Sequence, residues 1–190
     1  MAEFKNLSKS YDGVTVVDNF SLTLKKGDHV AIMGESGSGK TTLLSIAAGL
    51  TSPDSGSFTH DGKIAVMFQE PRLLPWKTAL ENIRTVLKKD SYTLADTYLS
   101  AVGLGGDGEK LPAQLSGGMA QRVAFARFLA YAEATDADLL LLDEPFSALD
   151  DETGSKMLNL LKTFAKGKTL LLITHDKQDA EAFTDKIVRL

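Results

Sequence analysis

The sequence contains no cysteine and no hydrophobic run long enough to cross a membrane. Without cysteine there is no disulfide framework and no thiolate metal site, which suits a reducing compartment. A spanning helix needs about 20 consecutive apolar residues, and Met1 is not followed by the charged and then apolar segments of a secretion signal. We therefore expect a soluble chain that reaches a membrane only through a partner.

An excess of charge of one sign is also missing. The chain has 21 Lys and Arg against 25 Asp and Glu, a net charge of −4, so it offers no broad attraction to nucleic acid or anionic lipid. Its 190 residues suit one compact α/β domain and are too few for two independent cores of ordinary size. Partners must therefore be identified from local motifs.

Residues 34–42, with the sequence GESGSGKTT, carry the clearest motif. They match the phosphate-binding pattern G-x-x-x-x-G-K-[ST] and lie between the apolar run 29–33 and a helical pattern that ends at Gly49. Glycines let several backbone N–H groups converge on one anion, and a helix beginning at Gly39 or Lys40 adds its positive dipole end. The alternative is a glycine-rich turn with a surface lysine. The pattern predicts a nucleotide site, in which Lys40 contacts the β- and γ-phosphates and Thr41 binds Mg²⁺. The residues of this site are Gly34, Ser36, Gly37, Ser38, Gly39, Lys40, Thr41 and Thr42.

A second glycine-containing loop, LSGG at residues 115–118, precedes the nearly all-apolar helix predicted at 123–134. Ser116 is a good N-cap, and Gly117 and Gly118 leave backbone N–H groups bare, so this loop is a second candidate anion site. Taken alone, it is equally well described as a capped helix start with flexible glycines.

Three predicted buried strands end in polar residues: 64–68 in Gln69, 137–142 in Asp143 and Glu144, and 169–174 in His175. The carboxyl ends of parallel strands are where such sheets bind ligands. Asp143 can hold Mg²⁺, and Glu144 can orient and deprotonate an attacking water. His175 can donate to a γ-phosphate. The alternatives are a strand cap for Gln69, a solvated strand end for the two acids, and a structural histidine.

The remaining segments predict an α/β chain. Residues 4–24 predict two or three antiparallel strands around an Asp12-Gly13 turn, and Tyr11 beside this turn is either a packed surface residue or a ring lying against adenine. A helical pattern extends from Thr78 to about Gly103, further helices are predicted at 152–165 and 179–183, and a last strand at 187–190. We take residues from about 78 to 130 as a mainly helical subdomain.

With these segments in place, the chain resembles the nucleotide-binding subunits of ATP-binding-cassette (ABC) transporters over nearly its whole length. The resemblance rests on the order of Tyr11, the phosphate loop, Gln69, the LSGG loop, the Asp143-Glu144 strand, the loop Ser147-Ala148-Leu149-Asp150 and His175. It implies the ABC ATPase fold: a P-loop NTPase core with a mostly parallel sheet, an N-terminal antiparallel β subdomain and a helical subdomain inserted at about 78–130, in one domain over residues 1–190.

The resemblance also implies a function. The chain would bind ATP and Mg²⁺ in a nucleotide-dependent, head-to-tail homodimer, with ATP between the phosphate loop of one subunit and Ser116, Gly117 and Gly118 of the other. Asp150 would lie near the dimer seam, Tyr11 would stack on adenine, Gln69 would contact Mg²⁺ or the attacking water, and His175 would donate to the γ-phosphate. Its partners would be transmembrane permease subunits and, indirectly, an extracytoplasmic solute-binding protein, at the cytoplasmic face of the cell membrane and without nucleic acid.

Residues 68–76, FQEPRLLPW, with LENI at 80–83 and Met119 where the family motif has Gln, are similar to importers of the nitrate, sulfonate and taurine type. Trp76 is either a docking anchor or a core residue. The segment between Gly56 and Ile64 is short for the family, and the chain stops soon after His175, so we expect a trimmed antiparallel subdomain and no regulatory tail.

Two other classes compete with a transport ATPase. A soluble ABC ATPase acting on DNA or ribosomes would carry a long insertion or a second cassette, and the sequence has neither. A GTP-dependent switch would need an Asn-Lys-x-Asp motif after a buried strand, where this chain reads HDKQD at 175–179.

Overall fold

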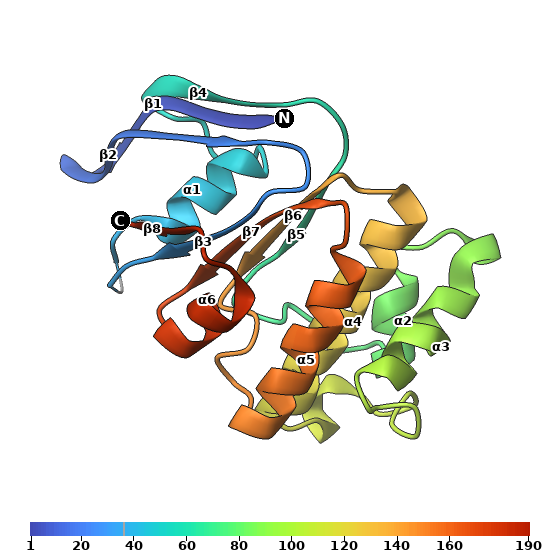
Figure 1. Ribbon diagram of the computed structural model, residues 1–190. Helices are drawn as coiled ribbons and strands as arrows, with labels where there is room; N and C mark the ends of the chain where they lie inside the picture. The colour runs from blue at the N-terminus through green and yellow to red at the C-terminus, as the bar shows by residue number, and fades with distance from the viewer. Residues whose placement is uncertain (36) are drawn as a thin grey trace. The chain divides into compact units, whose positions relative to one another are not determined.

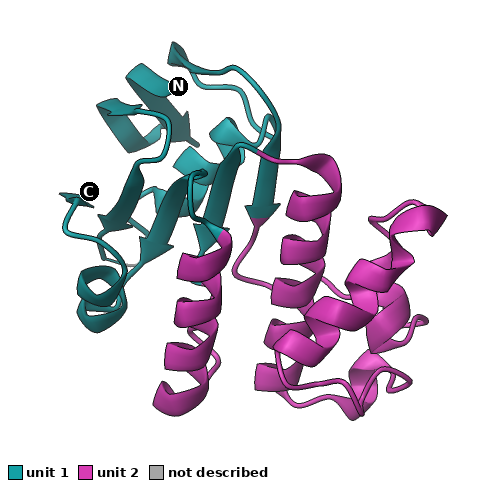
Figure 2. Cartoon of the chain, turned by 45° about the vertical axis from the view of Figure 1, so that its right-hand side comes forward, with its two compact units in different colours: residues 1–66, 138–144, 165–190 teal, residues 67–137, 145–164 magenta. Residues whose placement is uncertain are grey.

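The computed structural model describes residues 1–35 and 37–190. Ser36, which the sequence places in the phosphate site, lies outside the described residues. The chain divides into two compact units (Figure 2), with residues 1–66, 138–144 and 165–190 in unit 1 and residues 67–137 and 145–164 in unit 2. The predicted single domain with a helical insertion at about 78–130 stays a prediction.

Unit 1 contains an antiparallel sheet with the strand order β2-β1-β4 (Figure 1). Its strands are β1 (Ala2–Tyr11), β2 (Val14–Leu24) and β4 (Ser55–His60), which confirms the antiparallel strands predicted from the sequence. Asp12 and Gly13 join β1 to β2 in left-handed conformations, with φ of 49° and 79°. On the buried side, the Phe4 ring packs against the rings of Phe20 and Phe58, at centroid distances of 5.6 and 4.7 Å.

The second sheet has five strands in the order β5-β6-β7-β3-β8. They are β5 (Ile64–Met67), β6 (Leu139–Asp143), β7 (Thr169–Thr174), β3 (His29–Met33) and β8 (Ile187–Arg189). The pairs β6–β7, β7–β3 and β3–β8 are parallel. Every residue of β6 and β7 is buried, as continuous apolar runs in parallel sheets require.

Two short helices of unit 1 follow strands of this sheet. Helix α1 (Lys40–Ala47) comes after β3 and contacts β6, and helix α6 (Lys177–Phe183) comes after β7 and contacts β3 and β7. In the register of the parallel pairs, Met33 lies opposite Thr174, and Asp143 lies opposite Ile173. The segments that leave these three strands therefore start side by side at one edge of the sheet.

Unit 2 is helical in its described elements. It contains α2 (Ala79–Arg84), α3 (Tyr92–Ala101), α4 (Gly117–Thr135) and α5 (Asp151–Phe164), with 3-10 turns at Lys89–Ser91 and Pro112–Gln114. Helix α4 packs against α2 and α3. None of the described helices combines the length and the apolar character that a membrane span would need.

Two helix boundaries differ from the sequence prediction. The prediction of continuous helix from Thr78 to about Gly103 is wrong, because α2 ends at Arg84 and the next α-helix begins at Tyr92. Bonds between residues three apart, from Val86 N–H to the Ile83 carbonyl at 3.4 Å and from Leu87 N–H to the Arg84 carbonyl at 3.1 Å, close the turn. The polar residues 88–91 offer no apolar face to continue the helix. Helix α4 starts six residues before the predicted 123, since the Ser116 hydroxyl accepts from Met119 N–H and caps it.

Candidate functional site

The phosphate loop joins β3 to α1 in unit 1. Gly37 and Gly39 have left-handed backbones, with φ of 84° and 90°, and a Cβ at Gly39 would lie 2.5 Å from the Val16 carbonyl oxygen. Glycine is therefore required at position 39 by both conformation and space. Helix α1 begins at Lys40 without a side-chain cap, so its first N–H groups have no partner within the helix and are available to an anion.

The Lys40 ammonium is buried inside this loop. Its Nζ donates to the Gly34 carbonyl at 2.8 Å and to the Glu35 carbonyl at 2.7 Å. No carboxylate of the described residues lies within ion-pair distance of it. An ammonium has three N–H donors, and a buried cation without an acidic partner is costly unless an anion completes it. The loop therefore fits a phosphate group.

Ser38 gives independent support for that fit. Its Oγ is buried and has no hydrogen-bond partner among the described residues. A Cβ at Gly34 would lie 2.5 Å from this oxygen, so glycine at position 34 leaves the hydroxyl its room. Buried polar groups nearly always have a hydrogen-bond partner. For a buried hydroxyl in a phosphate-loop motif, a ligand oxygen can be that partner.

Thr41 and Asp143 meet next to this loop. The Thr41 hydroxyl donates to Asp143 Oδ2 at 2.6 Å, and Asp143 is only 1% exposed. Burial raises the pKa of the Asp143 carboxyl, while the bond from Thr41 acts in the opposite direction. No group of three or more acidic or histidine side chains that could hold a metal occurs among the described residues. One hydroxyl and one carboxylate instead suit Mg²⁺, which keeps waters and takes further oxygens from phosphates.

Glu144 and His175 form a second pair at the same edge of the sheet. His175 Nδ1 lies 2.8 Å from Glu144 Oε2. Glu144 has a left-handed backbone with φ of 46°, and its N–H donates to the Ile173 carbonyl at 2.9 Å. A left-handed glutamate is uncommon, and strained residues persist at functional sites where their surroundings hold them. The structure thus brings together two predicted catalytic side chains within unit 1.

Tyr11 also belongs to unit 1, at the end of β1. Its ring is 44% exposed, and Lys9 Nζ lies 5.4 Å from the ring centroid. The ring is therefore not packed into the core, and its predicted contact with adenine stays a prediction.

The other predicted site residues belong to unit 2 and are described within it. Ser116 caps α4, which begins with Gly117 and Gly118. The Asp150 carboxylate accepts from the backbone N–H and the hydroxyl of Thr153, both at 2.9 Å, and these bonds lower the pKa of Asp150. Gln69 is exposed. The predicted contacts of these residues with nucleotide stay predictions.

Trp76 is 72% exposed, so its alternative interpretation as a core residue is wrong. The loop that carries it is held by Asn82, which is fully buried. Asn82 accepts from Leu74 N–H and donates to the carbonyls of Leu74, Lys77 and Thr78. No motif of the sequence assigns Asn82 a role, although its place beside the apolar Ile83 in a predicted helix is a signal of a buried, satisfied amide.

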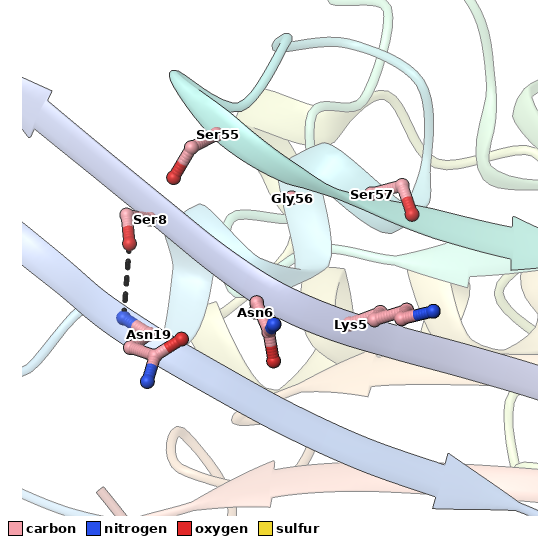
Figure 3. Close-up of a pocket in the computed structure, with 7 residues that line it drawn as sticks. All are labelled: Lys5, Asn6, Ser8, Asn19, Ser55, Gly56 and Ser57. Carbon is pink, nitrogen blue, oxygen red and sulfur yellow. Dashed lines mark hydrogen bonds between the residues drawn. The ribbon is translucent and has the colours of Figure 1, made fainter.

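A hollow of about 500 Å³ lies elsewhere in unit 1 (Figure 3). It opens where β1 and β2 are irregular, with left-handed Asn6 and Asn19 at φ of 47° and 46°. A Cβ at Gly56 would lie 2.3 Å from the carbonyl oxygens of Lys5 and Asn6, so only glycine fits at this place in the lining. No predicted site residue lines it; its residues are Lys5, Asn6, Ser8, Asn19, Ser55, Gly56 and Ser57.

Residues 17–147 match the family model described as ABC transporter. The chain therefore belongs to the ABC transporter family. It is 43% identical over 197 residues to the aliphatic sulfonates import ATP-binding protein SsuB of Cupriavidus necator, covering 97% of this chain and 64% of that protein. It is 44% identical over 190 residues to the protein of the same name from Cupriavidus pinatubonensis, covering 95% and 62%. The chain thus spans less than two thirds of the length of these two relatives.

Solved structures agree on the fold. The dimeric structure of the ATP-binding cassette MJ0796 in a post-hydrolysis state, bound to ADP and Pi, superposes with a TM-score of 0.91 at 34% identity, covering 100% of this chain and 94% of that one. A structure of an ATP-binding subunit of an ABC transporter gives a TM-score of 0.87 at 27% identity, covering 100% and 85%. The predicted ABC ATPase fold, with a mostly parallel sheet, an antiparallel sheet and helices, is confirmed.

Proposed function

We propose that the chain is the ATP-binding and hydrolysing subunit of an ABC-type importer for a small solute of the nitrate, sulfonate and taurine class. The observation that carries this proposal is the arrangement at one edge of the parallel sheet. There a buried lysine that forms no ion pair with the described residues, a Thr41–Asp143 bond and a Glu144–His175 pair follow three neighbouring strands. The relatives are import ATP-binding proteins by name, which supports the transport role.

ATP and Mg²⁺ are the cofactors that these residues fit. Residues 34–42 would surround the phosphates, with Lys40 at the β- and γ-phosphates and Tyr11 against the adenine. Thr41 and Asp143 would hold Mg²⁺, together with Gln69. The ion would supply neutralisation of the negative charge on the phosphate oxygens.

Glu144 and His175 are the side chains that would act directly on the attacking water and the γ-phosphate. Glu144 would orient a water beside the γ-phosphate and take one of its protons on a carboxylate oxygen as the water oxygen bonds to the γ-phosphorus. The bond from that phosphorus to the bridging oxygen would break, and ADP would leave with this oxygen. His175, already paired with Glu144, would steer that carboxylate and donate to a γ-phosphate oxygen. The gain in such a site comes from placement, because phosphoryl transfer depends mostly on positioning and electrostatics.

The partners follow from the same proposal. Two chains would form a nucleotide-dependent head-to-tail homodimer, in which Ser116, Gly117 and Gly118 of one subunit cover the ATP of the other and Asp150 lies near the seam. The dimer would sit at the cytoplasmic face of the membrane on permease subunits, which in turn receive solute from an extracytoplasmic binding protein. The whole of residues 1–190 would act as one cassette, with the helical part from about 78 to 130 carrying the signature loop.

Substitution of Lys40 tests this proposal. In Lys40→Ala the buried ammonium is gone, and we expect ATP hydrolysis by the purified chain to fall by at least about a hundredfold, the loss typical of one electrostatic group in a transition state. Circular dichroism should show an unchanged fold. Lys26→Ala, which removes an exposed lysine of the same unit, is the control and should retain wild-type activity. Normal hydrolysis by Lys40→Ala would refute the proposed site.

A further inference from the structure

Glu144 occupies a backbone conformation that its own side chain does not favour. Its φ of 46° lies in the left-handed region, where non-glycine residues are held by their surroundings. One restraint comes from the residue's own N–H, which donates to the Ile173 carbonyl at 2.9 Å. This bond holds the amide side of Glu144, and the other side of the residue leads to Pro145.

Gln121 supplies a restraint on that side. Its side-chain Nε2 donates to the Pro145 carbonyl at 3.1 Å, in a buried bond, and Gln121 is 1% exposed. Pro145 has a ring-fixed φ and no N–H of its own. Holding its carbonyl therefore limits the rotations left to the peptide that joins Glu144 to Pro145.

Helix α4, which carries Gln121, also packs against the residues that follow. The Phe146 ring meets the Phe125 ring edge-on, at 5.6 Å between centroids and 83° between planes. A Cβ at Gly118 would lie 3.1 Å from the Ala148 carbonyl oxygen, so this backbone approaches the start of α4 closely. The segment 145–148 is thus seated on α4 at three points, and the Gln121 bond is the one adjacent to Glu144.

We propose that Gln121 is a positioning residue for Glu144. The proposal rests on the function proposed above, in which Glu144 is the general base. By holding the Pro145 carbonyl, Gln121 keeps the Glu144 backbone in its left-handed conformation and so keeps the carboxylate directed at the attacking water. Misplacement of a reacting group by about 1 Å can lower a rate by about a hundredfold. Loss of the Gln121 bond should therefore act on the chemical step and not on the binding of ATP.

The test compares steady-state ATP hydrolysis by the purified full chain and its variants. Gln121→Leu has a similar volume and no donor, and Gln121→Met is an unbranched alternative of nearly the original length. We expect each to lower kcat at least tenfold and to leave KM for ATP within twofold. Arg122→Gln is the matched control: it comes from the same helix and removes a side-chain bond to a different loop, from Arg122 to the Val102 carbonyl at 2.9 Å. It should leave kcat within twofold.

A double-mutant cycle separates positioning from a general structural effect. If Gln121 acts through the base, Gln121→Met should not lower the residual single-turnover rate of Glu144→Gln any further. An equal fold-loss in both backgrounds would overturn the proposal, as would an equal loss in Arg122→Gln or a rise in KM at unchanged kcat. Unfolding of both Gln121 variants at 25 °C would also overturn it, since Gln121 would then be needed for folding. Failure of the proposed function shows separately, as a wild-type chain that hydrolyses no ATP.

Discussion

Asp143 is subject to opposite demands from stability and from function. Its carboxyl is 1% exposed, and burial raises its pKa above the usual value. A raised pKa in the fold means that the contribution of this group to stability is present at low pH and is lost as pH rises through the folded-state pKa. The stabilising contribution of this carboxyl therefore falls as pH rises, and the presence of an acid at this buried position is explained by the proposed metal.

The substitution Asp143→Asn should accordingly stabilise the isolated chain at pH 7.5 while impairing Mg²⁺-dependent ATP hydrolysis by at least a hundredfold. The amide oxygen can still accept from Thr41, so the Thr41–Asp143 contact is kept. Thermal unfolding should show a higher Tm, by about 2–4 °C for each 1 kcal/mol gained in a domain of this size, and the difference should shrink toward pH 4. Asp18→Asn, an exposed acid on β2, should change neither property. A lower Tm for Asp143→Asn would show that attraction from Lys40 outweighs the burial.

Charged residues of the site could be predicted from the sequence, whereas the carbonyl partners of the supporting amides could not. A lysine in a glycine loop and two acids after four leucines are costly arrangements without a ligand, so their positions alone indicate chemistry. Asn82 and Gln121 bond to carbonyls, and every residue offers one. Which carbonyl Gln121 meets depends on how the chain returns 24 residues later, and this follows from tertiary packing.

Among the secondary-structure elements, the most continuous patterns gave the most accurate predictions. The buried strands β6 and β7 and the start of α1 lie where the apolar runs and the phosphate-loop glycines place them. The break between α2 and α3 was missed because the apolar residues on either side of it, up to Leu87 and again from Leu94, keep a helical spacing across the polar residues 88–91. Apolar periodicity indicates which residues face a core. A turn that keeps the same residues on the core side therefore cannot be detected from this periodicity.

The loop between Leu74 and Thr78 is fixed in shape but exposes its largest side chain. Four bonds of the buried Asn82 hold the loop, and Arg127 donates to the carbonyls of Pro71 and Arg72 just before it. A rigid loop with an exposed tryptophan loses little entropy on binding, and tryptophan is a frequent interface hot spot. Trp76 therefore remains our candidate anchor for the permease.

We expect Trp76→Ala to weaken the association with the permease by about thirtyfold, which corresponds to a hot spot of about 2 kcal/mol. Transport should fall, while ATP hydrolysis by the isolated chain should stay within twofold, because an exposed side chain adds little to the fold. Co-purification with the permease from native membranes measures the first effect. Tyr131→Ala, another exposed aromatic in unit 2, is the control and should co-purify normally. A Trp76→Ala chain that co-purifies and transports like wild type would remove Trp76 from the interface.

For the whole molecule, the open question is why one short chain has two loops suited to anions. The first loop belongs to unit 1, where its described residues include Lys40 and Thr41 with their bonds to Gly34, Glu35 and Asp143. The second, at Ser116, begins the 19-residue helix α4 of unit 2. Two such loops in one chain are explained if each serves a different nucleotide, as in the proposed head-to-tail dimer. The related cassette MJ0796 was solved as a dimer bound to ADP and Pi, which supports the formation of a dimer.

The dimer can be tested by removing the proposed base without changing its shape. Glu144→Gln keeps the size of the side chain and its ability to form hydrogen bonds. Loss of general-base assistance should slow hydrolysis by about 10²- to 10⁴-fold, while ATP binding should be retained. Unhydrolysed ATP should then hold two subunits together, between Lys40 of one and Ser116 of the other. Size-exclusion chromatography with light scattering should show a dimer in Mg²⁺ and ATP and a monomer in ADP.

Adding Ser116→Arg places a bulky side chain in the second loop and should abolish the dimer. A Glu144→Gln chain that hydrolyses ATP at the wild-type rate would exclude Glu144 as the base, and one that is inactive but monomeric in ATP would leave the base in place and exclude the dimer for the isolated chain.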